Sequence, residues 1–493
     1  MKKKISKIIF ISLTLFLLVI IYEITNISFK IVNRSFITVD INNVRNPQIK
    51  NLIRSIDNIY ASLLIKYSEK HKYYYFNNDK RNKLDNYKII NKTDPIAKNL
   101  YPKKNNGAFW YRNYGNNASN RFSNLNLINK DNLHKLNIAW QYTIDEKVFS
   151  DIQSNVIVAE ERIFIPTNNK KIIALDAKSG KFIWELKLDN NAPRRGMVYL
   201  KDKKSNNAKL FFSSYKKLMS INPLNGKPNK KFGKNGFVKL KKPSITAPAI
   251  FENNLVITTS EPSLEVYDLN SGKLLWKFIL MKKKQKRNGG KRYDFSGGNP
   301  WGGFSLDEKR GIAYVTTGNA GRYFNGVNRP GKNEYANSIV AIDIKNKKKI
   351  WSFQEVRHDI WNLDLPSPPI LGSITKKNIK FDVVIAVTKL GNTIVLDRVT
   401  GKPIFDFHLT KAPSSNIPGE KTSFYQPSVK IPEPFSKNKF DLTEVTNISK
   451  ESRNFILKKI KNHKFGFFQT YEIGKKNIQF NFHCGAEWPG ASY

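Results

Sequence analysis

Side chains that can move protons are concentrated in one short stretch of this chain, residues 356–366, which reads V-R-H-D-I-W-N-L-D-L-P. Asp359 and Asp364 can accept a proton at neutral pH, and so can His358. The amide of Asn362, which stands among them, cannot. These residue types favour acid–base chemistry, and the surrounding elements must hold them in place.

The surrounding elements belong to a repeat that occurs five times. Each copy has an alternating apolar strand, a polar turn that ends in Gly or Lys, and a second strand with an aromatic residue. The copies are Ile172–Trp184, Leu218–Pro228 (a decayed copy), Ser263–Trp276, Ser338–Trp351 and Asn392–Phe405. This pattern predicts β-hairpins. In four copies the aromatic follows an Asp by eight residues, which indicates one packing position used repeatedly.

The spacing of the copies predicts a β-propeller. Their marker residues Asp176, Asn222, Asp268, Asp343 and Asp397 lie 46, 46, 75 and 54 positions apart. Periods of roughly 40–50 residues built from strands are typical of propellers. One four-stranded blade cannot bury both of its faces, so neighbouring blades must stack. The alternative is an all-β repeat without a ring. We expect the extra length before the fourth copy to be loop, where function collects on a rigid scaffold.

Composition favours a basic surface without a nucleic-acid partner. The 493 residues carry a net charge of +45, but Lys is dispersed along the whole chain. The one dense basic run, residues 281–292, has no interleaved aromatic stacking residues and is interpreted as a solvated loop rather than a phosphate-binding site. A basic surface can also attract anionic lipid head groups. Cys484 is the only cysteine, which excludes an intrachain disulfide.

The N-terminal residues predict a membrane anchor. Four Lys in the first seven residues precede an apolar run, Ile8–Tyr22, and no small-residue cleavage site follows. An uncleaved signal anchor over 1–24 is favoured over a cleaved signal peptide, with the bulk of the chain outside the cytoplasm. Residues 25–106 lack the repeat, and Asn43–Lys72 has apolar residues at helical spacing, so we predict a helical spacer. The propeller is expected over 107–493.

An ordered set of segments resembles the dehydrogenases that depend on pyrroloquinoline quinone (PQQ), above all the membrane-bound glucose dehydrogenase branch. The resemblance begins at Gly107 and extends to Tyr493. Its segments are Gly107–Gly115, Arg121–Leu125, Leu136–Trp140, Arg194–Gly196, Gly298–Trp301, Thr317–Asn319, Val356–Pro366, Thr388–Gly391, Pro418–Glu420, Tyr425–Pro427 and Gly485–Gly490. Each is weak alone, and the order makes the set specific. The resemblance implies an eight-bladed ring with PQQ and a calcium ion in its central funnel.

The resemblance also implies roles for individual residues. Trp301 matches the tryptophan that forms the floor under PQQ, and its indole offers a flat apolar face. Arg195 matches an arginine near the quinone oxygens, where a permanent cation stabilises the reduced cofactor. The alternative for Arg195 is one more surface cation. Lys389 matches the lysine that bonds the quinone carbonyl.

For calcium, the resemblance implies Asn319, whose amide oxygen is a hard neutral ligand. Gly318 and Asn319 can also form an ordinary turn. Glu261 is a second candidate for a calcium ligand, through a looser match.

Two departures from the family pattern stand out. In the family that this chain resembles, the catalytic base is an Asp. This chain has Asn362 at the corresponding position, so the family's base is missing there. Base catalysis is typically worth about 10²–10⁴-fold. Asp359, Asp364 or His358 can replace it, a hypothesis that rests on proximity in sequence. The family also continues past the segment that ends at Gly490, so we expect this chain to be a fragment.

The resulting expectation is a membrane-anchored quinoprotein dehydrogenase whose propeller faces the periplasm from the inner membrane. It would oxidise a sugar or alcohol CH–OH group and pass electrons to ubiquinone or another membrane acceptor. The alternative is a non-catalytic propeller of the same repeat family that acts as a scaffold or binding protein. Trp301, Asn319 and Lys389 together favour the enzyme, and Asn362 favours the scaffold.

Overall fold

The computed structural model describes residues 28–33, 36–40, 110–123, 125–144, 152–167, 169–201, 207–281, 284–288, 291–472, 474–479 and 485–493. The chain divides into two compact units, 1–101 and 102–493. In the first unit the described strands β1 (Ser28–Asn33) and β2 (Phe36–Asp40) form an antiparallel hairpin that the sequence did not predict. The expected anchor over 1–24 and helix over Asn43–Lys72 lie outside the described residues. Within the described residues, no helix has the length and apolarity needed to cross a bilayer.

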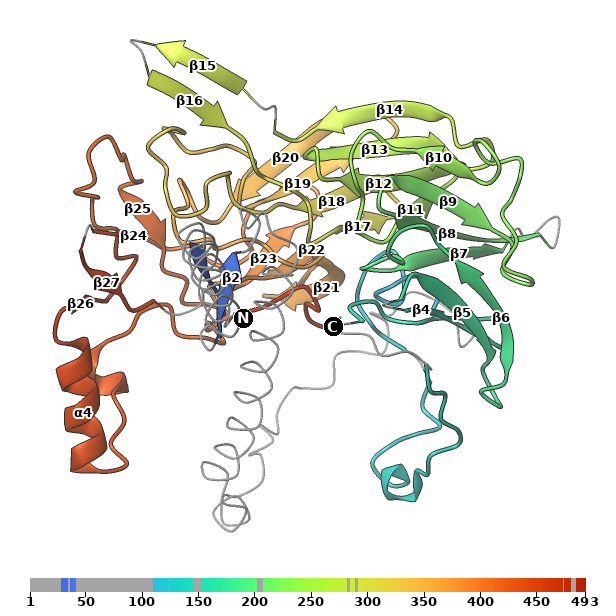
Figure 1. Ribbon diagram of the computed structural model, residues 1–493, viewed down its shortest axis with the longest axis horizontal. Coiled ribbons are helices and arrows are strands. Elements are labelled where there is room, and N and C mark those ends of the chain that lie inside the picture. The colour runs from blue at the N-terminus through green and yellow to red at the C-terminus, as the bar shows by residue number, and fades with distance from the viewer. Residues whose placement is uncertain are drawn as a thin grey trace, which may run out of the picture. The chain divides into compact units, whose positions relative to one another are not determined.

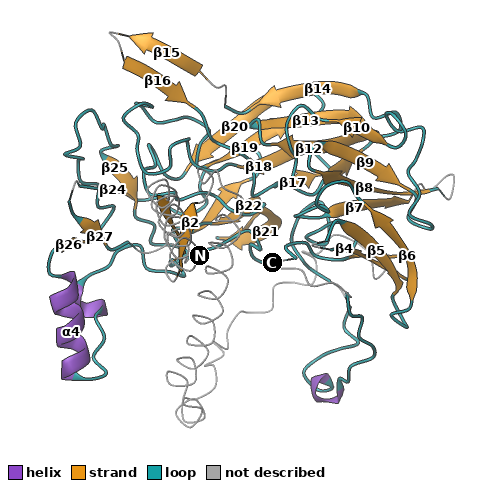
Figure 2. Ribbon diagram, viewed as in Figure 1, coloured by secondary structure: helices purple, strands orange, loops and turns teal. Residues whose placement is uncertain are grey.

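The second unit is an all-β, propeller-like array (Figures 1 and 2). Its described residues contain four four-stranded antiparallel sheets and one three-stranded sheet, each formed by strands consecutive in the chain. The strands are β3 (Ile157–Ala159), β4 (Arg162–Pro166), β5 (Lys171–Asp176) and β6 (Phe182–Lys187); β7 (Met197–Lys201), β8 (Ala208–Ser214), β9 (Lys217–Ile221) and β10 (Phe237–Lys239); β11 (Ala249–Phe251), β12 (Asn254–Thr259), β13 (Ser263–Asp268) and β14 (Leu274–Ile279); β17 (Phe304–Asp307), β18 (Ile312–Thr316), β19 (Ser338–Asp343) and β20 (Lys348–Gln354); β21 (Ile370–Lys376), β22 (Ile379–Val387) and β23 (Thr393–Asp397).

The predicted repeat hairpins are confirmed. β5–β6, β13–β14 and β19–β20 pair in the same register, with the tryptophan opposite the residue two positions before the Asp. In each, the register shifts by one residue immediately afterwards, as a bulge does. The decayed copy keeps a bridge from Ile221 to Pro228, and the last copy keeps one from Leu396 to Pro403.

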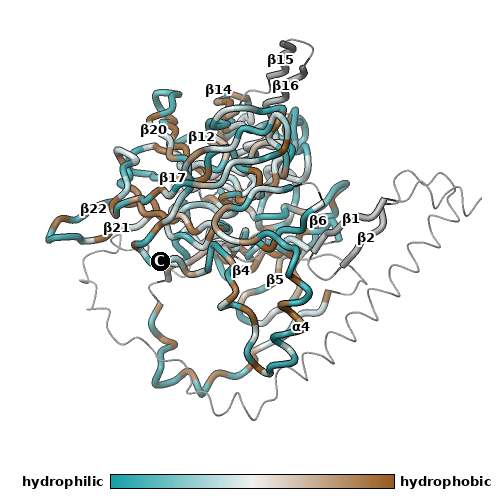
Figure 3. Tube along the Cα trace, turned by 90° about the vertical axis from the view of Figure 1, so that its left-hand side faces the viewer, coloured by the Kyte–Doolittle hydropathy of each residue, from teal (hydrophilic) through white to brown (hydrophobic). Residues whose placement is uncertain are grey.

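The hydrophobic core lies between the blades because alternate residues of a strand face opposite sides. In β12, Val256 packs into a cluster with the sheet β17–β20, whereas Leu255 and Ile257 pack into another cluster with the sheet β7–β10. In β18, Ala313 and Val315 belong to the cluster shared with β11–β14. Figure 3 shows apolar residues recurring along strands such as β4, β5 and β22. The blade β11–β14 therefore buries its two faces against two neighbouring blades.

The aromatic of one blade is docked on the turn of the next. The Trp184 indole Nε1 donates to Pro223 O (3.0 Å), and the ring lies over Gly226, where a Cβ would approach it to 2.7 Å. Trp351 makes the same contact with the turn that contains Gly401. Trp140, before the first described blade, docks likewise over Gly180. The fixed aromatic offset in the sequence thus corresponds to one repeated contact between blades.

The remaining elements are short and lie outside the five large sheets. They are the 3₁₀ helices η1 (Leu133–Lys135) and η2 (Leu442–Glu444), helix α4 (Lys450–Ile460), and strands β15 (Lys284–Asn288), β16 (Lys291–Phe295), β24 (Leu409–Lys411), β25 (Tyr425–Pro427), β26 (His463–Lys464) and β27 (Lys476–Asn477). The basic run over 281–292, expected to be loop, instead contributes to the hairpin β15–β16, which projects from the blades in Figure 1. The run of Lys and Arg there lacks the alternation of apolar and polar residues that predicts a strand.

Candidate active site

The turn between β20 and β21 carries the candidate proton-accepting residues, and Asp359 organises it. Its Oδ1 accepts the Trp361 N–H (2.7 Å), and its Oδ2 accepts the Leu363 N–H and the Asn337 Nδ2–H (2.8 Å each). Both oxygens are therefore committed to the backbone and to a neighbouring loop. Burial raises the pKa of Asp359 above its usual value, against these hydrogen bonds. Asp359 is thus a structural cap of the turn.

Asp364 follows on the same turn and connects two of the predicted site residues. Its Oδ2 accepts the Trp301 indole N–H (2.6 Å), and its Oδ1 accepts the Asn319 backbone N–H (3.1 Å). Burial raises the pKa of Asp364 to about 6, against the positive charge of Lys389. A carboxyl group with such a pKa is suited to accept a proton near neutrality.

Two cations lie against the Trp301 ring. The Arg195 guanidinium carbon is 4.6 Å from the ring centroid, and the Lys389 Nζ is 5.5 Å from it. Arg195 also donates to Trp301 O (2.6 Å), and burial lowers its pKa to about 10. Lys389 donates to Asn362 O (3.4 Å). The arrangement offers a flat aromatic face with fixed positive charge beside it, which suits a planar anionic ligand.

Trp488 is a further aromatic of this group that the sequence did not single out. Its ring centroid lies 5.7 Å from the Arg195 guanidinium, which therefore contacts two indoles. Trp488 lies in the segment 485–490, which carried the resemblance without a role attached. Only its contact with Arg195, almost 300 positions away in the sequence, shows that Trp488 belongs to the group around Trp301.

The two predicted calcium ligands are placed differently. Asn319 is buried beside Trp301 and Asp364, and its side-chain Nδ2 has no hydrogen-bond partner among the described residues. Glu261 pairs instead with Lys277 on β14, and its side chain is 37% exposed. The described contacts therefore bring Asn319, Trp301, Arg195, Lys389 and Asn362 together and leave Glu261 outside the group. Its role as a calcium ligand stays a prediction.

The turn that carries Lys389 rests on a buried acid that the sequence did not identify. Glu355 Oε1 accepts from Thr388 Oγ1 (2.9 Å) and from Asn392 Nδ2 (2.8 Å). Burial raises the pKa of Glu355 to about 7, and its Oε2 has no hydrogen-bond partner among the described residues. Glu355 thus binds Thr388 and Asn392, which lie on either side of Lys389 in the turn.

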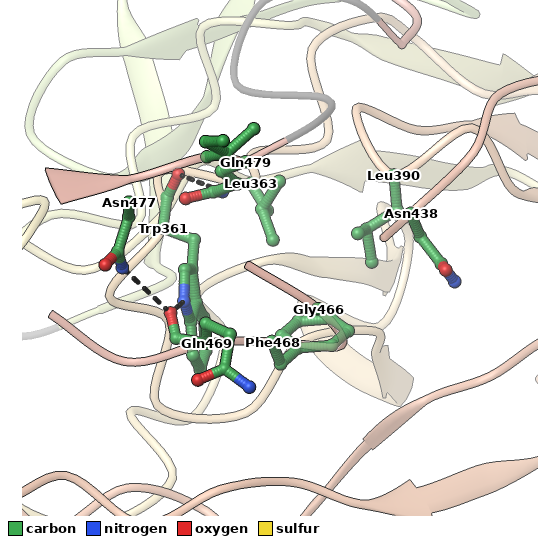
Figure 4. Close-up of a pocket in the computed structure, with 10 residues that line it drawn as sticks. Trp361, Leu363, Leu390, Asn438, Gly466, Phe468, Gln469, Asn477 and Gln479 are labelled. Atoms are coloured by element: carbon green, nitrogen blue, oxygen red, sulfur yellow. Dashed lines mark hydrogen bonds between the residues drawn. The ribbon is translucent and has the colours of Figure 1, made fainter. Parts of the chain in front are cut away.

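A pocket is lined in part by the turn between β20 and β21 (Figure 4). Its apolar wall includes Trp361, Leu363, Leu390 and Phe468, and carboxamides stand at its edge. The Trp361 indole is 1% exposed and donates to Gln469 O (2.8 Å). The segment around Phe468 therefore supports the turn from outside the blades. Such packing fixes the backbone on which Asn362 lies.

Comparison with known proteins identifies the same family that the ordered segments resemble. The family described as "Glucose/ethanol/alcohol dehydrogenase, beta-propeller domain", of PQQ type, matches residues 110–493. The quinoprotein glucose dehydrogenase of Escherichia coli is 30% identical over 67% of this chain and 47% of its own length. Quinoprotein glucose dehydrogenase A of Acinetobacter calcoaceticus is 31% identical over 65% of this chain and 46% of its own. The chain spans about half the length of the curated relatives it matches.

Solved structures share the fold at lower identity. The quinohemoprotein alcohol dehydrogenase of Comamonas testosteroni superposes with a TM-score of 0.53 at 21% identity, covering 67% of this chain and 53% of its own. A europium-containing methanol dehydrogenase gives a TM-score of 0.52 at 21% identity, covering 67% and 62% of the two chains. These likenesses concern the fold alone.

Proposed function

Because this chain belongs to the PQQ-dependent glucose/ethanol/alcohol dehydrogenase family through its β-propeller domain, we propose that it oxidises a CH–OH group of a sugar or alcohol. The observation that carries the proposal is the buried group around Trp301. One indole is held at its Nε1 by Asp364 and flanked on its ring by Arg195 and Lys389. Relatives whose names specify glucose and glycerol support this class of substrate.

The residues of this group fit PQQ, a planar tricyclic ring system with several carboxylates. Trp301 would support its flat face, and the two cations would hold its anionic oxygens. When bound, PQQ would accept the hydride of the substrate carbon, which carries the two electrons of the oxidation. The side chain of Asn319 lies beside the Asp364 carboxyl, and the two side chains carry amide and carboxylate oxygens of the kind calcium prefers.

The proton of the substrate hydroxyl would go to Asp364. Asn362, at the family's base position, has no basic group, and the hydrogen bonds of Asp359 come from its own turn and from Asn337 rather than from Trp301. Both ring nitrogens of His358 contact other acceptors. Asp364 is the remaining acid next to Trp301, and its pKa of about 6 makes it a competent acceptor at neutral pH.

Cofactor binding is tested by titrating the purified protein with PQQ and calcium while tryptophan fluorescence is recorded. We expect quenching in the native protein and its loss in Trp301→Ala and Lys389→Ala. Trp184→Phe is the control, since Trp184 is docked between blades. Quenching that persists in Trp301→Ala would place the cofactor elsewhere.

Proton transfer is tested by dye reduction with glucose, glycerol and ethanol as substrates. Asp364→Asn should lower turnover by about 10²–10⁴-fold with PQQ still bound. Asn362→Asp should raise turnover if the native site lacks an effective base. A protein that binds PQQ and oxidises none of these substrates, with or without Asn362→Asp, would support the binding-protein alternative that Asn362 suggests.

We propose that the N-terminal residues anchor the protein to the inner membrane, with the propeller on the periplasmic side and a membrane quinone such as ubiquinone as the electron acceptor. The support is the apolar run Ile8–Tyr22 behind a cluster of lysines. Deletion of residues 1–24 should move the protein from the membrane fraction to the soluble one. Retention of the shortened protein in the membrane would contradict the anchor.

A further inference from the structure

His358 and Glu420 form a buried pair at which three loops meet. The His358 Nε2 lies 2.7 Å from Glu420 Oε1, and both side chains are 2% exposed. The other ring nitrogen, Nδ1, lies 2.8 Å from Gly331 O. Glu420 Oε2 accepts the Gly326 N–H (2.6 Å). The loop between β18 and β19, the turn after β20 and the segment before β25 are thereby joined.

The hydrogen bonds of the pair require two protons, whereas a neutral histidine ring carries only one N–H. A carbonyl oxygen and a carboxylate oxygen both accept hydrogen bonds, so both ring nitrogens must donate unless Glu420 is itself protonated. Burial opposes ionisation of Glu420, but the hydrogen bonds from His358 and Gly326 and the charge of Arg329 outweigh it and hold its pKa below the usual value. The second proton therefore belongs on the imidazole.

The surrounding charges agree with this assignment. Arg329 is 1% exposed, donates to Asp359 O and lies near both Asp359 and Glu420. Two buried carboxylates thus face one permanent cation, and a protonated His358 balances the second. Glu355 and Asp364, in the turn after β20, are also buried. The other side chains of these loops that are charged at neutral pH are exposed or half-buried: Arg322, Lys332, Glu334, Arg357 and Lys421.

The backbone of the turn shows what the pair restrains. His358 has a φ of +50° and Asn362 a φ of +62°, in the left-handed region that disfavours residues other than glycine. Such conformations persist where surrounding contacts hold them. Gly326 leaves no space for a side chain, because a Cβ there would clash with His358 Nε2. The contact between the loops is therefore close as well as polar.

We infer that the His358–Glu420 pair is a positioning device, which holds the turn bearing Asn362 and Asp364 against the loop bearing Asn319 only while the pair keeps its shared proton. The importance of this turn for chemistry rests on the proposed function, whereas the proton and the contact do not. Loss of the proton as pH rises leaves two acceptors facing each other. Protonation of Glu420 at low pH removes the negative charge that faces the protonated His358.

The test is hydrogen–deuterium exchange of the full chain without cofactor, read on peptides that span 326–332 and 356–364. After correction for intrinsic rates, exchange in the native protein should accelerate roughly tenfold between pH 6 and pH 9, as one charged hydrogen bond is lost. Glu420→Gln should keep the contact and abolish the pH dependence, because its amide can donate to a neutral His358 and its oxygen can accept from Gly326. His358→Ala should exchange fast at every pH.

Glu444→Gln is the matched control, since it removes a carboxylate that pairs with Lys437 away from the site. It should keep the native pH dependence. Nitrogen NMR of His358 gives a second measurement, with both ring nitrogens protonated at pH 7. A neutral ring at pH 7, or the same pH dependence in Glu420→Gln as in the native protein, would overturn the inference. Because neither readout needs PQQ or substrate, an absence of dehydrogenase activity would not affect it.

Discussion

Two kinds of turn in this protein are held by an Asp side chain that accepts backbone N–H groups, one kind at the surface and the other buried. In the repeat hairpins, a half-buried Asp at the start of an exposed turn accepts the backbone N–H three residues on, as Asp397 does from Thr400 (2.7 Å). In the turn after β20, the buried Asp359 accepts backbone N–H groups in the same way. The decayed repeat replaces the acid by Asn222, which still accepts the Leu224 N–H (2.8 Å). Exposed turns therefore need an acceptor oxygen, whereas the buried turn depends on a negative charge with its partners.

The largest effect should come from removing the charge in the buried turn. Asp359→Asn would point an amide N–H₂ group at one of three N–H donors and leave Arg329 without its nearer counter-charge. Breaking a buried network of this kind costs about 3–5 kcal/mol. Urea unfolding at pH 7 measures it. A cost under about 1 kcal/mol would show that the buried turn is as tolerant as the exposed ones.

Glu355 should make stability depend on pH with a definite sign. Its pKa rises from 4.5 in the unfolded chain to about 7 in the folded protein, so folding favours the protonated form. The contribution of Glu355 to stability is highest below pH 4.5, falls as pH rises to about 7 and is constant above it, with a total loss of about 3 kcal/mol. Glu355→Gln keeps an acceptor for Thr388 and Asn392 and should be more stable than the native protein at pH 8. Equal unfolding midpoints for the two proteins at pH 8 would contradict this.

A smaller effect is expected where a turn receives the tryptophan of the preceding blade. Gly226 has a φ of +69°, and a Cβ there would lie 2.7 Å from the Trp184 ring. Gly226→Ala should therefore destabilise the protein by about 1–3 kcal/mol. Calorimetry of this variant beside Gly331→Ala, which also has a positive φ but open space around it, separates the clash from the backbone strain.

The smallest effect should come from the exposed turns. Asp397→Asn preserves the oxygen that accepts from Thr400 and should change stability by less than about 0.5 kcal/mol. Urea unfolding of Asp397→Asn and of Asp359→Asn measures the cost of the same substitution in an exposed turn and in the buried turn. A cost for Asp397→Asn that approaches that of Asp359→Asn would remove the distinction between the two kinds of turn.

The repeat made the blades predictable, because hairpin pairing and the docked tryptophan are local and periodic. The candidate site residues Trp301, Arg195 and Lys389 depart from the repeat, and the resemblance of the ordered segments to the family predicted them. Glu355, Trp488 and the role of Glu420 could not be predicted, since their partners lie far along the chain and no spacing rule joins them. Asp364 could be named as a candidate, but only its contact with Trp301 distinguishes it from Asp359.

The docked tryptophans also bear on how such a chain can grow. The first described blade has both halves of this joint: its Gly180 turn receives the Trp140 indole, and its own Trp184 docks over the Gly226 turn of the next blade. A tandem duplication of one unit therefore arrives with both halves of the joint already matched to its neighbours. New chemistry can then arise in the stretches between copies, without redesign of the contacts that hold the copies together.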